Sequence, residues 1–347
     1  MDDVCQFWAS AHACAALVDL PRLAQRVGGW GPFQLLDGPA LRREGLPERI
    51  VARWANARPW NTAGRVITLA DPLYPALLRA VPRPPALLCV EGSLDVLQRP
   101  AVAVVGARRC TADGAAVARQ LGHALSSAGW CVVSGLARGI DTAAHLGAST
   151  SGRTVAVLAH GLAHTAPASN RRLRRQIVAD GGAVVTTLPD HVEPRPYLFP
   201  IRNRWIAGLV STVVIVEAAR RSGTMHTVRA ATDFGREVYA VPGAISAPAS
   251  RGCLQLIDEG AGVVVSVQSF LEGLGSVAPS SGEWVDDVIG GTPLVEVALK
   301  CGRSVHELVV ELGRLELTGV VVRLPGRRYS WGAEWESSDA RTLGSNR

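Results

Sequence analysis

Three short loops of the sequence combine small residues with arginine, each directly after a run of β-branched residues. Glycine allows backbone amides to approach a phosphate group, and the N-terminus of a following helix favours an anion. An arginine adds two parallel hydrogen bonds from one guanidinium group. We therefore expect a phosphate-binding rim made of Gly106-Ala107-Arg108-Arg109, Ser134-Gly135-Leu136-Ala137-Arg138-Gly139 and Arg220-Arg221-Ser222-Gly223-Thr224.

A fourth segment, EPRPYLFPIRNR, interleaves aromatic side chains with basic ones. Basic side chains can follow a nucleic-acid backbone while an exposed ring stacks on a base, which contributes about 1–3 kcal/mol per base. The combination is typical of proteins that bind single strands, and here it consists of Arg195, Tyr197, Phe199, Arg202 and Arg204. Other interpretations stay open, because Phe199 beside Pro200 could be a core residue and any one glycine-rich loop could be a structural turn or a nucleotide site.

Catalytic and metal-binding groupings are weak in this sequence. Asp141 and His145 stand four residues apart, on one face of a predicted helix, but without a third ligand or a nucleophile they favour a structural hydrogen bond. No G-x-G-x-x-G follows the first strand, so NAD binding is not expected. We expect no catalytic residue, no metal and no cofactor. The alternative is a nucleotide-binding or nucleotide-processing Rossmann-group enzyme, of whose P-G-G-x-G-T signature only Pro242-Gly243 remains.

Runs of β-branched residues alternate with helix-length stretches from Ile67 onward. Such apolar strands, separated by amphipathic segments, indicate a parallel sheet that helices cover on both faces. The predicted fold class is α/β, with a doubly wound and mainly parallel sheet. Its expected strands are 101–106, 131–135, 154–158, 183–187, 212–217 and 237–241. Ligands of these sheets bind beyond the carboxyl ends of the strands, which is where the arginine loops stand.

Composition marks further domains at both ends of the chain. Residues 1–64 are rich in Ala, Leu, Arg and Trp at helical spacing, which predicts a small helical domain of the SAM or helix-hairpin-helix type. The sheet domain is expected over residues 65–275. A linker at 276–291, a winged-helix-like domain at 292–332 and a flexible tail at 333–347 should follow.

The winged-helix expectation rests on the order of local signals after the linker. A helix at 293–301 precedes a turn, and Ser304 with Glu307 three positions later forms a capping box that opens a second helix. Two short strands would then form a wing. The second helix carries Glu311 and Glu316 as well, so a protein partner is favoured over sequence-specific duplex recognition.

The chain carries a formal net charge of +6, which fits a polyanionic partner such as nucleic acid. Among its 36 basic residues Lys300 is the single lysine, so a coding bias toward arginine could produce the same excess. The run Arg171, Arg172, Arg174 and Arg175 is more typical of a solvated helix face than of a groove. Seven cysteines without C-x-x-C spacing favour reduced thiols, and no apolar run reaches the ~18 residues of a membrane span. We expect a cytoplasmic protein without a membrane partner.

Seven motifs resemble, in their order and spacing, those of the bacterial DNA-processing protein A (DprA/Smf) family. They span roughly Ile67 to Val265 and are ITLADPLYPALL, VAVVGARR, SGLARGIDTAAH, FPIRNRWIAGL, VEAARRSG, VPG and RGCLQLIDEGA. The resemblance implies an extended Rossmann-like fold that binds single-stranded DNA without catalysis. It also implies a homodimer that protects incoming DNA and loads the RecA recombinase in natural transformation or related recombination. The apolar positions Leu254, Leu256, Ile257 and Val263–Val265 are a candidate dimer interface, unless they are buried at the sheet edge.

The same resemblance implies a positively charged DNA-binding pocket, which here consists of Gly106, Arg108, Ser134, Gly135, Arg138, Gly139, Arg202, Asn203, Arg204, Ser222 and Gly223. Asp141 would support the pocket by holding its backbone or an arginine, because a carboxylate facing a phosphate would repel it. The sequence departs from the family at Ala107, where serine is common, and at Ala166 and Leu254. These departures concern pocket geometry and DNA affinity rather than the fold.

Overall fold

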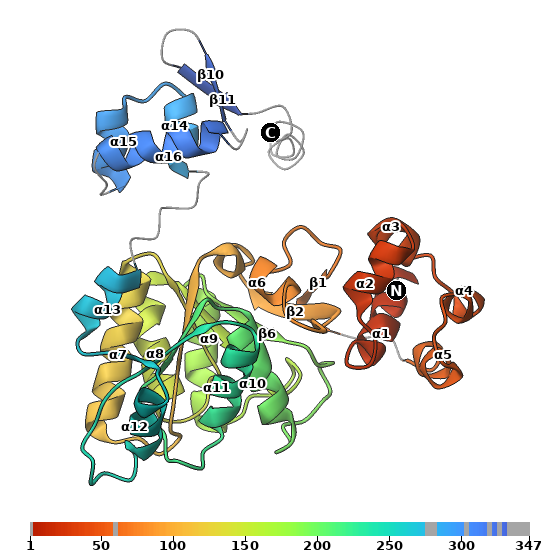
Figure 1. Cartoon of the computed structure of the whole chain (residues 1–347), viewed down its shortest axis with the longest axis horizontal. Coiled ribbons are helices and arrows are strands. Elements are labelled where there is room, and N and C mark those ends of the chain that lie inside the picture. The colour runs from red at the N-terminus through yellow and green to blue at the C-terminus, as the bar shows by residue number, and fades with distance from the viewer. Residues whose placement is uncertain are drawn as a thin grey trace. The chain divides into compact units, whose positions relative to one another are not determined.

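The computed structural model describes residues 3–57, 62–274, 283–301, 305–317, 321–324 and 328–331. The chain folds into two compact units, Met1–Val277 and Ala278–Arg347 (Figure 1). Among the described residues, the first unit contains a large sheet with its helices, and the second contains three helices and a two-stranded antiparallel sheet.

A nine-stranded sheet forms the centre of the first unit, in the order β1-β2-β6-β5-β4-β3-β7-β8-β9. The pairs from β6 to β9 are parallel, whereas β1 with β2 and β2 with β6 are antiparallel. This confirms the predicted doubly wound, mainly parallel α/β fold. The strands are β1 (Arg65–Thr68), β2 (Leu87–Gly92), β3 (Ala101–Val105), β4 (Cys131–Ser134), β5 (Thr154–Val157), β6 (Ala183–Thr186), β7 (Thr212–Ile215), β8 (Glu237–Ala240) and β9 (Gly262–Val263).

The chain order of the strands creates a switch point in the sheet. From β3 the chain adds β4, β5 and β6 on one side, and it then returns to the other side with β7 and β8. The two halves therefore diverge between β3 and β7, which is where open α/β sheets bind ligands.

The strand runs form where predicted because every residue of β3 to β7 is buried. Val102 and Val104 pack in one core cluster and Ala103 and Val105 in another, so successive side chains of β3 serve opposite faces. The strands β1, β2 and β9 lie outside the six predicted runs. The pattern of β1 and β9 is hard to detect, because they are short and partly exposed.

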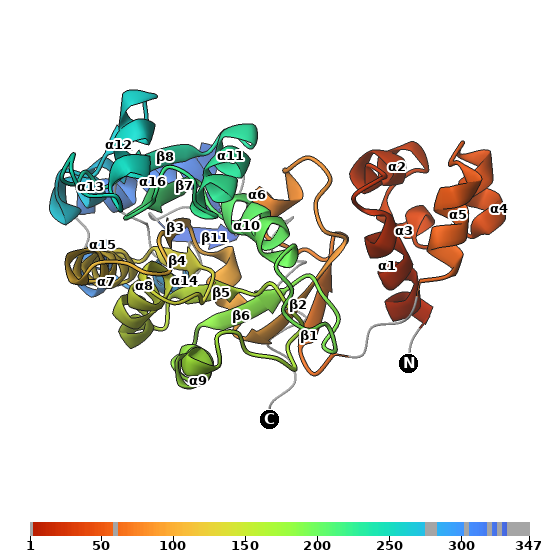
Figure 2. The same cartoon turned by 90° about the horizontal axis from the view of Figure 1, so that it is seen from below.

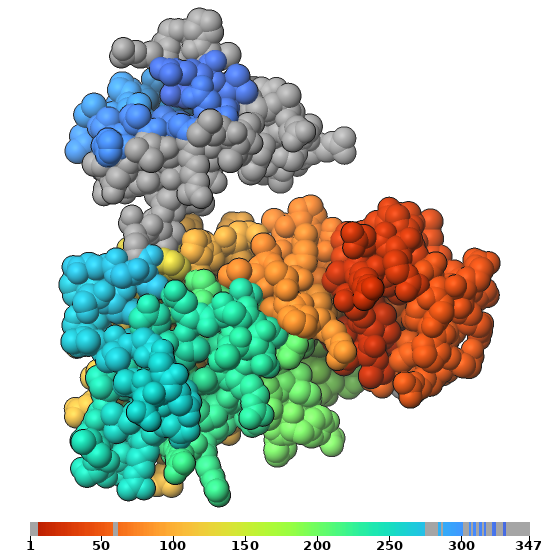
Figure 3. Space-filling model, viewed as in Figure 1, coloured from red at the N-terminus to blue at the C-terminus, as the bar shows by residue number. Residues whose placement is uncertain are grey.

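Helices cover both faces of the sheet (Figure 2). The helices α7 (Ala112–Ser127) and α8 (Ile140–Ala148) lie on one face, and α10 (Leu198–Gly208) and α11 (Thr224–Asp233) lie on the other. The side chains of residues 198–274, green to cyan, cover much of the face seen in Figure 3. The remaining helical segments here are α6 (Ala76–Arg79), η1 (Asp95–Gln98), η2 (Ser149–Ser151), η3 (Ala168–Asn170), α9 (Arg171–Ala179), α12 (Arg251–Asp258) and α13 (Val267–Leu274).

Five short helices precede the sheet, where a small helical domain is predicted. Edge-to-face contacts join Phe7 to Trp8, Phe33 and Trp54, so aromatic rings form much of its core. Asp19 and Asp37 cap two of the helices. The boundary at residue 64 stays a prediction. The helices are α1 (Asp3–Cys14), α2 (Leu20–Arg26), α3 (Trp30–Phe33), α4 (Gly38–Arg43) and α5 (Glu48–Ala55).

The second unit differs from the predicted layout in one respect. Helix α14 (Glu283–Ile289) occupies part of the predicted linker 276–291, because Trp284, Val285 and Val288 are buried against the helices that follow. Those elements are α15 (Leu294–Cys301), α16 (Val305–Leu317), and an antiparallel hairpin of β10 (Val321–Leu324) and β11 (Arg328–Trp331). The winged-helix arrangement of residues 292–332 stays a prediction. The predicted turns at Gly302-Arg303 and Pro325-Gly326 and the predicted tail at 333–347 lie outside the described residues.

Candidate functional site

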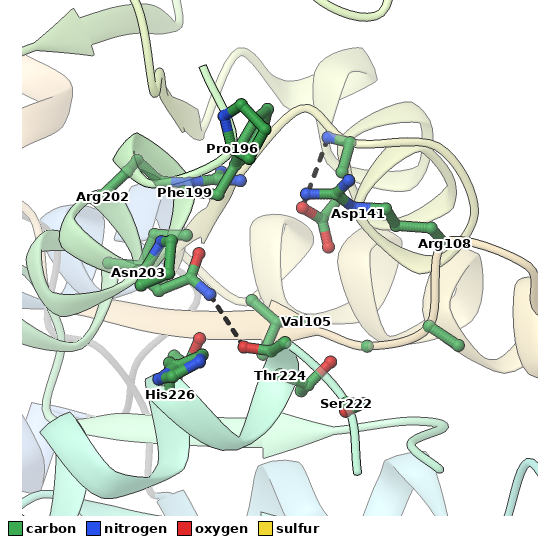
Figure 4. A pocket seen from close by; sticks show the side chains of 17 residues that line it. Val105, Arg108, Asp141, Pro196, Phe199, Arg202, Asn203, Ser222, Thr224 and His226 are labelled. Atoms are coloured by element: carbon green, nitrogen blue, oxygen red, sulfur yellow. Dashed lines mark hydrogen bonds between the residues drawn. The ribbon is translucent and has the colours of Figure 1, made fainter. Parts of the chain in front are cut away.

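A pocket of about 460 Å³ opens at the switch point, beyond the carboxyl ends of β3, β4 and β7 (Figure 4). Helices α10 and α11 form its other walls. It brings together eight of the residues predicted from the sequence: Gly106, Arg108, Asp141, Phe199, Arg202, Asn203, Ser222 and Gly223. Segments more than one hundred residues apart in the chain thus meet at one site.

Arg108 and Phe199 form a stacked pair in the pocket. The Cζ atom of Arg108 lies 4.5 Å from the centroid of the Phe199 ring. The ring is only partly buried, so it is a wall of the pocket rather than a core residue. Arg108 itself is exposed, and among the described residues its guanidinium makes no hydrogen bond or ion pair. The pair presents a flat surface with unused hydrogen-bond donors.

Arg202 is a buried positive charge at the floor of the pocket. Its side chain donates a hydrogen bond to the carbonyl of Val157 at 3.0 Å, and it lies 5.9 Å from the centroid of the Phe199 ring. The guanidinium fills the space that a side chain at Gly135 would need, since a Cβ atom there would lie only 1.4 Å from Nη1. A side chain at position 135 would therefore displace the Arg202 guanidinium from this place.

Asp141 holds the loop after β4 in place. Its carboxylate accepts the backbone N–H groups of Gly135 at 3.1 Å and Ala137 at 3.3 Å. Burial raises the pKa of Asp141, and the charge of Arg202 opposes that rise. Burial also lowers the pKa of Arg202 to about 10, although Asp141 counteracts it. At neutral pH Arg202 therefore stays charged and keeps the floor of the pocket positive.

Several predicted residues do not line the pocket. Ser134 is buried and donates its hydroxyl to the carbonyl of Val104 at 2.7 Å. Arg204 donates to the carbonyl of Pro82 and stacks on Phe234, on the opposite side of α10 from Arg202. The side chains of Arg138, Arg195 and Tyr197 are exposed outside the lining. Gly139 packs on the loop that carries Arg108, since a Cβ atom added at this position would lie 2.3 Å from the carbonyl oxygen of Ala107.

Glu217 was not among the predicted site residues, although it fixes the loop that carries Arg108. Its backbone carbonyl accepts the N–H of Ala107 at 2.7 Å. Its buried carboxylate accepts the backbone N–H of Thr111 at 2.9 Å and the hydroxyl of the same residue. The sequence gives no signal for this role, because Glu217 and Thr111 are 106 positions apart. The pocket also includes Thr224 and His226 from the start of α11.

Glu217→Gln should lower the free energy of unfolding by about 1–3 kcal/mol, the usual cost of a buried donor left without its acceptor. The amide oxygen of Gln can accept from only one of the two Thr111 groups, so the hydroxyl proton of Thr111 loses its acceptor and the negative charge that strengthens both bonds is lost. Chemical denaturation measures the change, with the exposed Glu193→Gln as the control. Equal stability of the two variants would show that the carboxylate does not hold this loop.

His145 should make folding stability depend on pH. Burial, together with the charge of Arg202, lowers its pKa from 6.5 to about 3. Its Nδ1 donates to the hydroxyl of Thr154 at 2.8 Å, because that hydroxyl already donates to the carbonyl of Val132. The unfolded chain binds a proton here below pH ~6.5 and the folded chain does not, so stability falls as the pH falls through this range.

His145→Asn keeps a donor to Thr154 without a titrating group. Between pH 7 and 5 the wild type should lose about 2 kcal/mol more stability than the variant, at about 1.4 kcal/mol per pH unit for one proton. Urea unfolding at both pH values measures the difference. The wild type and the variant share all other titrating groups. Parallel pH profiles of their unfolding free energies would therefore contradict the assignment of this pH dependence to His145.

Neither a metal-binding cluster nor a membrane-spanning helix occurs in the part of the chain that the structure describes. It holds no group of three or more His, Cys, Asp or Glu side chains that could bind a metal ion. Within the same residues, no helix has the length and apolar character needed to cross a membrane.

Residues 65–275 match the family described as DNA recombination-mediator protein A. The chain is 35% identical over 334 residues to protein Smf of Escherichia coli (strain K12), an alignment that covers 87% of this chain and 89% of that protein. It is 42% identical over 205 residues to DNA processing protein DprA of Streptococcus pneumoniae (strain ATCC BAA-255 / R6), covering 59% of this chain and 72% of that protein.

Two solved structures are similar to this one. The X-ray structure of DprA from Streptococcus pneumoniae has a TM-score of 0.67 at 34% identity, and covers 77% of this chain and 95% of its own. DprA from Helicobacter pylori, whose structure describes a single-stranded DNA binding mode, has a TM-score of 0.56 at 26% identity. It covers 61% of this chain and 96% of its own.

Proposed function

The chain belongs to the DNA recombination-mediator protein A family of DNA-processing proteins, and from this premise we propose that its pocket binds single-stranded DNA. The observation that supports this best is the stacked pair of Arg108 and Phe199. A guanidinium on a ring offers a planar surface for an unpaired base, and the free donors of Arg108 suit a phosphate oxygen. A base in a duplex is already stacked on both sides, so such a surface favours single strands.

The departure at Ala107 increases the expected dependence on Arg108. Ala107 has no hydroxyl, its N–H donates to Glu217 and its carbonyl accepts from Ile140. Neither its side chain nor its backbone has a hydrogen-bonding group left for a phosphate. We therefore assign the phosphate contact of this loop to the Arg108 guanidinium.

The experiment is a titration with mixed-sequence single strands at several salt concentrations. The logarithm of the association constant should fall linearly with the logarithm of salt, by about 0.7 per phosphate contact. Affinity that does not change with salt would contradict binding through arginine and phosphate.

We propose that the protein acts by binding and not by catalysis. The alternative, a nucleotide-processing enzyme, would need a nucleophile and a general base aligned at the pocket. Asp141 is committed to two backbone N–H groups, and among the described residues no hydrogen bond joins His226 to the hydroxyl of Ser222 or Thr224. Incubation with ATP, NAD or nucleoside monophosphates and magnesium should yield no product. Product in excess of the protein concentration would favour the enzyme.

We also propose a homodimer that hands single strands to the RecA recombinase. The candidate interface is the open edge of the sheet at β9, where Val263 and Val265 are 42% and 81% exposed while Leu256 and Val264 are buried. A second pocket on the same strand would raise the avidity about 10²–10⁴-fold. Sedimentation of the wild type and of Val265→Glu tests the dimer, and RecA filament growth on strands coated with single-strand-binding protein tests the transfer. A monomeric wild type that does not speed filament growth would overturn this part of the proposal only.

A further inference from the structure

We propose that helix α9 carries a second DNA-binding surface, on which Arg171, Arg172 and Arg175 contact the phosphates of a strand that leaves the pocket past Arg138. This inference rests on the proposed binding of single-stranded DNA in the pocket. It extends the site beyond the pocket, along the outer face of one helix.

The four arginines of α9 have two different roles. Arg174 is buried and serves the fold, because its guanidinium pairs with Glu91 and donates to the carbonyls of Leu162 and His164. Arg171, Arg172 and Arg175 are exposed, and no hydrogen bond or ion pair involves their side chains among the described residues. Three positive charges on this helix are thus unpaired.

The surface between these side chains is open to solvent. Arg172, Arg175, Gln176 and Ala179 line a shallow, open patch on the outer side of α9. The opposite side of the helix is anchored in the core by Leu173 and Ile177. The arginines therefore stand on a fixed element and point away from the sheet.

The helix is joined directly to the pocket wall. Asn170, the residue before α9, donates from Nδ2 to the carbonyls of Leu136 at 3.0 Å and Ala137 at 3.3 Å and to the hydroxyl of Thr142 at 2.8 Å. Ala137 lines the pocket, and the exposed Arg138 follows it. The start of α9 is thus tied to the loop that lines the pocket and carries Arg138.

The spacing of the arginines along the helix suits an extended strand. Arg171 and Arg175 are four residues apart, which separates them by about 6 Å along the axis. Two like charges at this spacing weaken an isolated helix by a few tenths of a kcal/mol, and no acidic residue of α9 offsets them. A polyanion bound across these arginines would remove this repulsion. If the surface faced only solvent, the repulsion would remain.

The test compares a triple variant, Arg171→Gln, Arg172→Gln and Arg175→Gln, with a control that loses the same charge elsewhere in the first unit. The control is Arg119→Gln, Arg229→Gln and Arg251→Gln, since these arginines lie on α7, α11 and α12, outside the pocket lining and away from α9. Each protein is titrated with oligothymidylates of about 6 and about 20 nucleotides. The first lies near the lower end of the ~4–16 nucleotides that single-strand-binding domains cover, and the second exceeds the upper end.

The triple variant should bind the short strand as the wild type does, but the long strand at least 10-fold more weakly. Its salt slope on the long strand should fall by about 2, which corresponds to three lost phosphate contacts at about 0.7 each. The control should match the wild type on both strands. If the triple variant binds the long strand normally, or if the control loses as much affinity, α9 is not a DNA surface.

The short strand separates this inference from the proposed function. A wild type that does not bind the short strand would refute binding in the pocket, whatever α9 does. If the triple variant binds both strands normally and yet slows RecA filament growth, the surface serves a protein partner, and the inference about DNA is overturned.

Discussion

Arg108→Ala should weaken the binding of single-stranded DNA by about 10- to 100-fold, because a hydrogen bond to a charged group is worth about 1.5–3 kcal/mol. The guanidinium is exposed and makes no hydrogen bond among the described residues, so its removal should leave the free energy of unfolding within about 0.5 kcal/mol of the wild type. The variant should therefore bind DNA more weakly while its folding stability stays unchanged.

Fluorescence anisotropy with a labelled strand measures the affinity, and thermal unfolding measures the stability. Arg109→Ala is the matched control, since Arg109 is the exposed neighbour of Arg108 but does not line the pocket. If both variants bind as the wild type does, the phosphate contact has been assigned to the wrong loop.

Gly135→Ala should have the larger effect on the whole site. The new Cβ atom would lie 1.4 Å from Nη1 of Arg202, so the guanidinium would have to leave its buried position. That movement breaks the hydrogen bond to the carbonyl of Val157 and separates Arg202 from Asp141. Disrupting a buried charge in this way costs about 3–5 kcal/mol. We expect a large drop in melting temperature and the loss of DNA binding.

Gly273→Ala is the control for this substitution, because no atom lies within 4 Å of the Cβ position at Gly273 on α13. It should be at least as stable as the wild type, because Ala is favoured over Gly within a helix by about 0.5–1 kcal/mol. A Gly135→Ala protein that melts and binds normally would mean that the Arg202 side chain can be accommodated elsewhere, and the assignment of Arg202 to the pocket floor would be wrong.

The strands and the position of the site could be predicted from the sequence because their signals are local. A run such as AVAVV is buried on both faces and has little alternative to a central parallel strand. The rule that ligands bind beyond the carboxyl ends of such strands then places the pocket. Strand β2 has a similar buried apolar run, but nothing in its residues specifies antiparallel pairing beside β6, and the partly exposed β1 carries a weaker signal.

The roles of individual arginines could not be predicted, because they depend on helix rotation. Arg202 and Arg204 are alike in type and only two residues apart, yet two positions on a helix differ by about 200°. Arg202 therefore faces the pocket floor and Arg204 faces Phe234. Helix α10 has apolar residues on most sides, so its sequence does not show which side is buried.

Glu217 illustrates the other limit of sequence reasoning. Its carboxylate could be predicted to be functional only by knowing that Thr111 lies against it, which is a tertiary contact. Ser134 shows the reverse case, because a serine at a strand end suits a phosphate site but here bonds within the sheet. Residue type predicts the chemistry that is possible, and packing decides which residues can use it.

Preference for single strands over duplex is tested most directly by equilibrium competition. The protein is bound to a labelled mixed-sequence strand, and it is then displaced by the same strand unlabelled or annealed to its complement. We expect the unlabelled strand to compete at concentrations at least 10-fold lower than the duplex, with Arg108→Ala reducing the difference. Equal competition by strand and duplex would contradict the binding of unpaired bases at the Arg108 and Phe199 pair.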